Sequence, residues 1–224
     1  RAGTSLLHKF LKNNQQVVAF PEKSGVDNSE GIFLQDVYPY FGIGTEGTKG
    51  GKRGQESGIG TYALHARNYL NETSELVSME NRRIMFNSWS YFWDLSQTNT
   101  VLMERSPTNM LIARFLQAQF TLSGQETTAG SFFLVMSRHP IAVSFSLRQW
   151  SICKHLSLET LIENWLAEHE RWKQDISNLK YTFSTKYEEL VADPEKVLRK
   201  VCAWLGVDFV PSMLEIDEVI VDGN

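Results

Sequence analysis

The chain has 224 residues, of which 42% are hydrophobic and 21% are charged, a composition typical of globular domains. Its formal net charge of −4 argues against a general nucleic-acid-binding surface, which is usually strongly basic, so an anionic ligand must meet local positive charge. No apolar run approaches the ~18 residues that a membrane-spanning helix needs. The length suffices for one α/β domain with a sizeable core.

A helix is predicted at the beginning of the sequence. The segment Arg1–Ser5 leads directly into apolar residues at positions 6, 7, 10 and 11, a spacing that places them on one helical face. Farther along, residues 42–60 contain eight glycines in nineteen positions. Such a composition does not build a core element, and it predicts a long mobile loop.

The rest of the chain alternates between predicted strands and predicted helices. Short apolar runs predict strands at residues 100–104, 131–137 and 181–185. Apolar residues at helical spacing predict helices over 109–120, from Pro140 onward, over 158–176 and from Pro194 to Gly206. This alternation predicts an α/β fold with three layers, α/β/α, around a central parallel sheet. We expect residues 1–224 to form a single domain.

The cysteines and the one glycosylation triplet carry little functional information. Cys153 and Cys202 both lie in apolar helical stretches and are predicted to be buried free thiols. No Cys/His cluster has the spacing of metal ligands, so we expect no bound metal. The Asn71-Glu72-Thr73 triplet is only weak support for a secretory route, because such triplets are common by chance.

The first residues have the features of a phosphate-binding loop. Gly3 lets backbone N–H groups approach a ligand closely, and the following helix N-terminus adds partial positive charge. Thr4 and Ser5 supply hydroxyl donors, and Arg1 supplies a full charge. The same residues also fit an ordinary helix cap, so this segment alone leaves both interpretations open.

The loop differs from the usual ATP-binding loop in two respects. The pattern G-x-x-x-x-G-K-[ST] is absent, and no carboxylate ends the apolar run 132–137 to hold magnesium. These absences favour a phosphate-containing donor that needs no metal over a kinase substrate. A kinase-like phosphotransferase remains the alternative enzyme class.

A second candidate anion site lies after the predicted strand 131–137. Arg138 ends this strand, and Ser146 lies eight positions later, two turns along the next predicted helix. Both side chains could reach one anion from two sides. Alternatively, Arg138 is an ordinary surface arginine and Ser146 is a helix residue without a functional role.

Four motifs in this order resemble the superfamily of sulfotransferases that use 3′-phosphoadenosine 5′-phosphosulfate (PAPS). They are Arg-x-Gly-Thr-Ser-Leu-Leu from position 1, Glu-Arg-Ser-Pro from 104, Arg-His-Pro-x-x-x-x-x-Ser from 138 and Tyr-Glu-Glu-Leu-x-x-Asp-Pro from 187. The resemblance covers the chain from its beginning to about Gly206 and implies a fold like that of P-loop nucleoside triphosphate hydrolases. Runs at 30–35 (Glu-Gly-x-x-Leu-Gln) and 106–109 (Ser-Pro-x-Asn) look nearest to bacterial and algal members, often taken as carbohydrate sulfotransferases.

The resemblance implies a role for each motif. Residues that would bind the 5′-phosphosulfate are Arg1, Ala2, Gly3, Thr4, Ser5 and Leu6. Arg138 and Ser146 would hold the 3′-phosphate, and Tyr187 would lie near the adenine. Arg105 would lie close to the transferring group. The implied partners are PAPS, its product PAP and an acceptor substrate, for which we expect a carbohydrate hydroxyl group or, less favoured, an amine.

The expected chemistry is an in-line displacement at sulfur without a metal. The leaving phosphate oxygen needs positive charge, which we assign to Arg1 and Arg105. The acceptor hydroxyl needs a general base. Glu30 and Glu22 both have the implied position, and the Glu-Gly-x-x-Leu-Gln context favours Glu30, although a solvated loop carboxylate is the alternative.

Further expectations concern other bases and the ends of the sequence. His139 and His155 are the next candidates for the base. The family's strand before Arg1 and its basic loop near the C-terminus have no counterpart in the sequence, since residues 207–224 contain no Lys or Arg. An inactive nucleotide-binding remnant is therefore the non-enzymatic alternative. The resemblance fits the cytoplasm for a bacterial source and the Golgi lumen for a eukaryotic one, and it indicates no oligomeric state.

Overall fold

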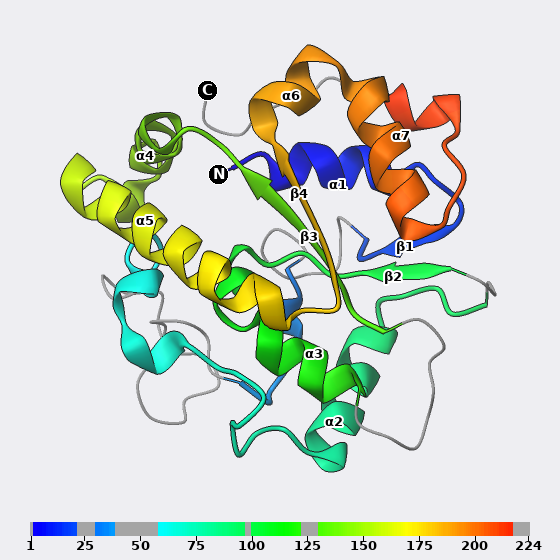
Figure 1. The fold of residues 1–224 in the computed structure, drawn as a ribbon, viewed down its shortest axis with the longest axis horizontal. Coiled ribbons are helices and arrows are strands. Elements are labelled where there is room, and N and C mark those ends of the chain that lie inside the picture. The colour runs from blue at the N-terminus through cyan, green and yellow to red at the C-terminus, as the bar shows by residue number, and fades with distance from the viewer. Residues whose placement is uncertain (1, 22–29, 39–57, 97–99, 122–129, 217–224) are drawn as a thin grey trace.

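Four short parallel strands form the centre of the protein in a computed structural model that describes residues 2–21, 30–38, 58–96, 100–121 and 130–216 (Figure 1). β1 (Val17–Ala19) pairs in parallel with β2 (Val101–Met103), so that Val17 lies beside Val101. β3 (Phe132–Ser137) pairs in parallel with β4 (Tyr181–Lys186), so that Phe132 lies beside Tyr181.

Helices cover both faces of these strands (Figure 1). On one face lie α1 (Thr4–Lys12), α6 (Tyr187–Ala192) and α7 (Pro194–Leu205), and on the other lie α2 (Met79–Ser90), α3 (Ala113–Thr121) and α5 (Leu158–Asp175). α4 (Pro140–Arg148) follows β3 and packs against α5. Short 3₁₀ helices include η2 (Gly31–Leu34), η3 (Tyr62–Leu64) and η5 (Pro107–Leu111).

The alternation of side chains along the strands explains the layers. Leu134 and Met136 of β3 pack in the core beneath α1 and α7. Phe133 and Val135 pack on the opposite face, in cores that include residues of α3 and α5. Because successive strand residues point to opposite faces, both faces need an apolar cover. The predicted α/β class is confirmed.

The predicted elements after position 100 are present, with the end signals that the sequence contains. Pro140 and Pro194 lie in the first turns of their helices. The Asp193 side chain accepts a hydrogen bond from the Lys196 N–H at 3.0 Å, and Gly206 ends α7 with a φ of 74°. Cys153 and Cys202 are buried free thiols, as predicted. Most of the glycine-rich stretch 42–60 lies outside the described residues.

The central sheet differs from the prediction in one respect. Within the described ranges, the strands form two separate two-stranded ladders instead of one continuous sheet. β2 and β3 do not pair with each other, but residues of both strands line one cavity of about 830 Å³. The two ladders are nevertheless held in one core, because Val101 and Met103 of β2 pack in the same cluster as Leu134 and Met136 of β3.

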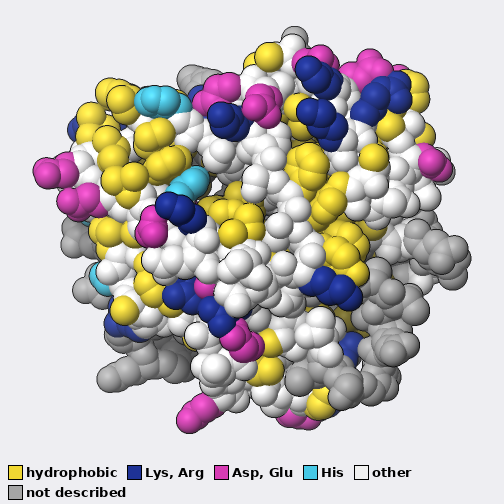
Figure 2. Space-filling model, viewed as in Figure 1, with side chains coloured by type: hydrophobic (Ala, Val, Ile, Leu, Met, Phe, Trp, Pro, Cys, Tyr) yellow, Lys and Arg dark blue, Asp and Glu magenta, His cyan; other side chains and the backbone are white. Residues whose placement is uncertain are grey.

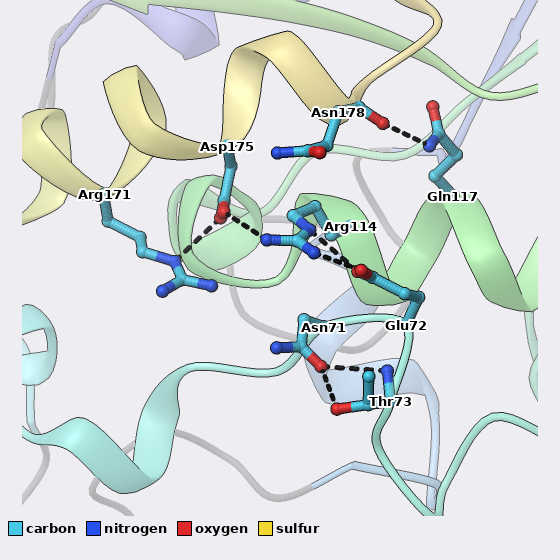
Figure 3. Close-up of polar contacts among 8 residues, drawn as sticks. All are labelled: Asn71, Glu72, Thr73, Arg114, Gln117, Arg171, Asp175 and Asn178. Carbon is cyan, nitrogen blue, oxygen red and sulfur yellow. Dashed lines mark hydrogen bonds and ion pairs between the residues drawn. The ribbon is translucent and has the colours of Figure 1, made fainter.

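An ionic cluster joins α3, α5 and the segment before α2 (Figure 3). Asp175, which is 1% exposed, accepts hydrogen bonds from Arg114 at 3.3 Å and from Arg171 at 2.8 Å. Arg114 also donates to Glu72 at 2.7 Å. The adjacent Asn71 side chain accepts two hydrogen bonds from Thr73, which forms a tight local turn.

The surface combines mixed charge with apolar areas. Figure 2 shows hydrophobic side chains gathered over α4 and α5, where Ile141, Phe145 and Leu166 are about half exposed. Elsewhere on the same face, acidic and basic side chains are intermixed (Figure 2). None of the described helices combines the length and apolar composition needed to cross a membrane.

Candidate active site

The candidate functional residues follow the carboxyl ends of the strands, where ligands bind in parallel α/β sheets. Glu104 and Arg105 come directly after β2, Arg138 comes directly after β3, and Tyr187 comes directly after β4. The N-terminus of α1 contributes Gly3. This placement converts motifs that are far apart in the sequence into two neighbouring groups, one around Gly3 and one around Glu30.

Gly3, Tyr187 and Arg138 form the first group. Gly3 has a φ of 99°, and a Cβ atom at this position would lie 2.1 Å from Cδ2 of Tyr187. The position therefore requires glycine both for its backbone conformation and for the close approach of the ring. The guanidinium group of Arg138 lies 4.3 Å from the centre of the same ring. One aromatic side chain thus links the first turn of α1 to the arginine after β3.

The other residues predicted to bind the donor lie in different environments. Ala2 and Thr4 line the large cavity, whereas Ser5 is exposed and Leu6 packs against the core beneath α7. Ser146 is half-buried in the last turn of α4, the helix that follows Arg138. Arg1 lies outside the described residues.

Glu30 is the centre of the second group. It precedes η2, lines the cavity and is partly buried. Burial raises the pKa of Glu30 to about 7, against the effect of Arg105, which lowers this pKa, and with that of Glu104, which raises it. A carboxyl group with such a pKa is suited to accept a proton near neutral pH. Glu22 lies outside the described residues, and His139 and His155 are both exposed.

Glu104 and Ser106 hold the backbone that follows Glu30. Oε1 of Glu104 accepts hydrogen bonds from the Gly31 N–H at 2.8 Å and from the Ser106 hydroxyl at 2.5 Å. Oγ of Ser106 in turn accepts a hydrogen bond from the Ile32 N–H at 3.0 Å. A Cβ atom at Gly31 would lie 2.4 Å from Cγ of Glu104, so this contact requires glycine. We call these residues, Gly31, Ile32, Glu104 and Ser106, the Glu30 clamp.

Further hydrogen bonds complete the clamp. The Asn109 amide donates to Oε2 of Glu104, and the Trp89 indole N–H donates to the Gly31 carbonyl at 3.0 Å. The Gln35 side chain donates to the carbonyls of Ile32 and Tyr38 and accepts from the Tyr38 N–H. The two motifs Glu-Gly-x-x-Leu-Gln and Ser-Pro-x-Asn are therefore joined by hydrogen bonds. This contact gives their residues a structural role that the sequence alone did not reveal.

The cavity continues from Glu30 and Arg105 to the buried face of α5. Tyr62, Trp165 and Glu168 line this side, and none of them was predicted as a site residue. The sequence contained one signal, because Asn164 and Glu168 share the helical stripe of the buried Leu161 and Trp172. Polar residues on an apolar stripe indicate a specific interaction. Across the described residues, no three His, Cys, Asp or Glu side chains gather as metal ligands would.

Comparison with protein families assigns the chain. The model of the family described as "Sulfotransferase family" matches residues 1–211. The chain belongs to the sulfotransferase family. It is therefore a sulfotransferase, and the family implies a sulfonate donor and an acceptor substrate for the groups described above. Among curated proteins, no significant sequence match was found.

Two solved structures resemble the fold of this sulfotransferase. One is the sulfotransferase domain from the curacin biosynthetic pathway, with a TM-score of 0.55, 17% identity, and coverage of 95% of this chain and 73% of the other. The second is a sulfotransferase from Alicyclobacillus acidocaldarius, with a TM-score of 0.52, 18% identity, and coverage of 97% and 83%. At these identities the likeness concerns the fold alone.

Proposed function

We propose that this sulfotransferase uses PAPS as its donor and a carbohydrate hydroxyl group as its acceptor. The observation that carries the proposal is the position of Glu30, a partly buried carboxyl group close to the charge of Arg105, in a cavity that also reaches Thr4 of α1. A base, a cation and a helix N-terminus can together support sulfuryl transfer to a hydroxyl.

The first group of residues fits an adenosine bisphosphate. The N-terminus of α1 offers backbone N–H groups and partial positive charge to the 5′ end of the donor, with Thr4 adding a hydroxyl donor. Arg138 offers a planar fork of N–H groups to the 3′-phosphate, and the Tyr187 ring beside it offers a surface for the adenine. Gly3 keeps this ring close to the loop. Arg1, Ala2, Ser5, Leu6 and Ser146 remain candidate donor contacts.

The second group performs the chemistry in this proposal. Glu30 removes the proton from the acceptor hydroxyl as its oxygen attacks sulfur. The new O–S bond forms while the bond between sulfur and the phosphate oxygen breaks. Arg105, with Arg1 as a second candidate, stabilises the negative charge that develops on the leaving phosphate oxygen. The Glu30 clamp keeps the base in place during this step.

Two observations support a carbohydrate acceptor. The cavity volume of about 830 Å³ is within the range for small-molecule sites, ~300–1,000 Å³, and leaves room for a sugar beside the donor. Its walls combine aromatic side chains, including Trp89 and Trp165, with polar groups that can bind hydroxyls.

The test combines binding and turnover. Calorimetric titration with PAP measures donor-site binding, and transfer from radiolabelled PAPS is measured with a panel of hydroxylated and amine acceptors, with and without a magnesium chelator. PAP binding and chelator-resistant transfer to sugars would support the proposal. Magnesium-dependent transfer from ATP would indicate a kinase, and PAP binding without any transfer would indicate an inactive remnant.

A further inference from the structure

Glu168 of α5 is a buried carboxyl group that the proposed transfer chemistry does not use. Its side chain is 9% exposed and lines the same cavity as Glu30. Oε1 accepts a hydrogen bond from the Tyr62 hydroxyl at 2.6 Å. Asn164, one turn earlier, accepts from the Ala63 N–H at 2.8 Å and thereby fixes η3, which carries Tyr62. Glu168 is thus held rigidly at the cavity wall.

The hydrogen bonds of Glu168 differ from those of Glu104 and Asp175. Glu104 uses both oxygens, which bind Gly31, Ser106 and Asn109. Asp175 also uses both oxygens, one for each of two arginines. Within the described residues Oε2 of Glu168 has no such partner. A deeply buried carboxyl group ordinarily has both oxygens paired, so a half-satisfied one beside a cavity points to a ligand.

Trp165 and His169, next to Glu168 on α5, also carry unpartnered groups. Their rings are stacked with centres 3.7 Å apart, and both line the cavity. Nδ1 of His169 lies 2.8 Å from the Trp165 carbonyl. Because a carbonyl only accepts, Nδ1 carries the proton, and Nε2 of the neutral ring is a hydrogen-bond acceptor. Burial lowers the pKa of His169, which favours this neutral form.

The remaining donor is the Trp165 indole N–H. Trp165 Nε1 and His169 Nε2 are both buried, and neither has a hydrogen-bond partner in the described part of the chain. One side of α5 therefore presents a carboxyl oxygen, an N–H donor and a nitrogen acceptor. Hydroxyl groups both donate and accept, so several hydroxyls on one molecule match this mixed set, whereas a simple alcohol matches one member at most.

We infer that Tyr62, Trp165, Glu168 and His169 form a subsite that binds non-reacting hydroxyl groups of a polyhydroxylated acceptor such as a sugar. This inference rests on the proposed function and deepens it, since it assigns recognition of the acceptor to α5 and η3. Gly3, Arg138 and Tyr187 belong to other elements, α1 and the segments after β3 and β4, so we expect the subsite to select the acceptor without contributing to nucleotide binding.

The test compares Glu168→Met with the wild type, using a panel of methyl hexosides and cyclohexylmethanol, an alcohol with one hydroxyl. Met removes the hydrogen bonds and keeps most of the volume. The double variant Tyr62→Phe/Glu168→Met avoids an unpaired Tyr62 hydroxyl. Glu163→Gln, an exposed position on the same helix, is the control. The measurements are kcat and KM for each acceptor, hexoside binding by calorimetry in the presence of PAP, and PAP binding.

Both Met variants should raise the KM and the dissociation constant of the preferred hexoside by about tenfold or more, as for loss of a hydrogen bond to a charged group. The kcat/KM for cyclohexylmethanol and PAP binding should change by less than about twofold. Equal losses for both acceptors, or unchanged hexoside binding, would overturn the subsite. If hexosides bind and depend on Glu168 but no transfer from PAPS occurs, the subsite stands and the proposed function fails.

Discussion

Glu30 is the residue on which the proposed chemistry depends most directly. Its environment contains opposing influences, since burial and Glu104 raise its pKa while Arg105 lowers it. The balance leaves a base that is ionised in a substantial fraction of molecules at neutral pH. A solvated loop carboxylate would be ionised more fully but would be a weaker base.

Replacing Glu30 with Gln should lower kcat by roughly 10²–10⁴-fold and leave PAP binding intact, because the base is lost while the volume is kept. In the wild type, kcat/KM should fall as the pH drops below about 7, since protonated Glu30 cannot accept a proton. The checks are a pH–rate profile and PAP calorimetry. Full activity of Glu30→Gln, or a profile without an acidic limb, would place the base elsewhere.

Arg138 provides a separate test of the donor site. Arg138→Ala should weaken PAP binding by roughly 2–4 kcal/mol, as for loss of a charge-assisted contact to phosphate. Arg148→Ala, an exposed arginine on α4, is the matched control and should bind PAP normally. Calorimetry on both variants measures the difference. Equal affinities would contradict the assignment of Arg138 to the 3′-phosphate.

The sequence predicts the position of some site residues better than that of others. Gly3, Arg138 and Tyr187 belong to motifs of characteristic local spacing, and the structure brings all three together. Glu168 and Tyr62 are separated by more than a hundred positions, and only the packing of η3 against α5 brings them into contact. No local pattern contains that information, apart from the polar residues on an apolar helical stripe.

At the scale of elements, predictions succeeded where periodicity was strong. α5 and α7 have continuous apolar faces, and β3 is an almost entirely apolar run. β1 and α6 are only three and six residues long, too short for a clear period. α2 was missed because its buried face includes Arg82 beside Met85 and Trp89, a mixture that resembles an exposed segment.

The Glu30 clamp connects η2 to the segment after β2, and Gly31 is its most sensitive position. Gly31→Ala should lower kcat by about tenfold or more, with PAP binding unchanged, because the added Cβ would lie 2.4 Å from Glu104 and displace Glu30. The control is Gly206→Ala, where no atom lies within 4 Å of a new Cβ but φ is 74°. That change should cost about 1 kcal/mol of stability and leave kcat unaltered. Equal kcat values for the two variants would contradict this role of the clamp.

The ionic cluster of Figure 3 should contribute to the stability of the fold and not to catalysis. Asp175→Asn should lower the free energy of unfolding by up to about 3 kcal/mol, the lower end of the range for a broken buried pair, because the two arginines are each about one-fifth exposed. Glu195→Gln, which breaks the exposed pair with Arg199, should cost less than about 0.5 kcal/mol. Chemical denaturation measures both, and similar losses would show that burial of Asp175 is unimportant.

For the molecule as a whole, the sequence best predicts the layered arrangement of strands and helices. The alternation of strands and helices predicted a parallel arrangement covered on both faces, and this is what forms. The separation into two ladders was not predicted. Strand pairing depends on which backbone edges meet in space, and apolar content alone does not determine this.

Carboxyl groups with raised pKa values, Glu30, Glu104 and Glu168, should give the whole protein an unusual pH dependence. Burial raises the pKa values of Glu30 and Glu168 from 4.5 to about 7, so the folded state binds more protons than the unfolded state between these values. Their contribution to stability is complete below pH 4.5 and is lost as the pH rises through 7. It amounts to at most about 1.4 kcal/mol per group for each pH unit.

Thermal unfolding should therefore show a higher Tm at pH 5.5 than at pH 8. Glu168→Gln should reduce this difference, because one of the carboxyl groups with a raised pKa is removed. Carboxylates with lowered pKa values, such as Glu72 and Glu188, lose their contribution only at more acidic pH. A Tm that rises from pH 5.5 to pH 8 would contradict this account.

Because the proposed donor contacts and acceptor contacts come from different elements, such an enzyme could change its acceptor and keep its donor. The proposed donor contacts come from α1 and the segments after β3 and β4, whereas the proposed acceptor contacts come from η3 and α5. In this proposal, substitutions on η3 and α5 would alter the choice of acceptor while the proposed donor contacts stay unchanged. A laboratory evolution experiment that varies only residues 58–69 and the buried face of α5 should therefore yield new sulfated products from a small set of positions.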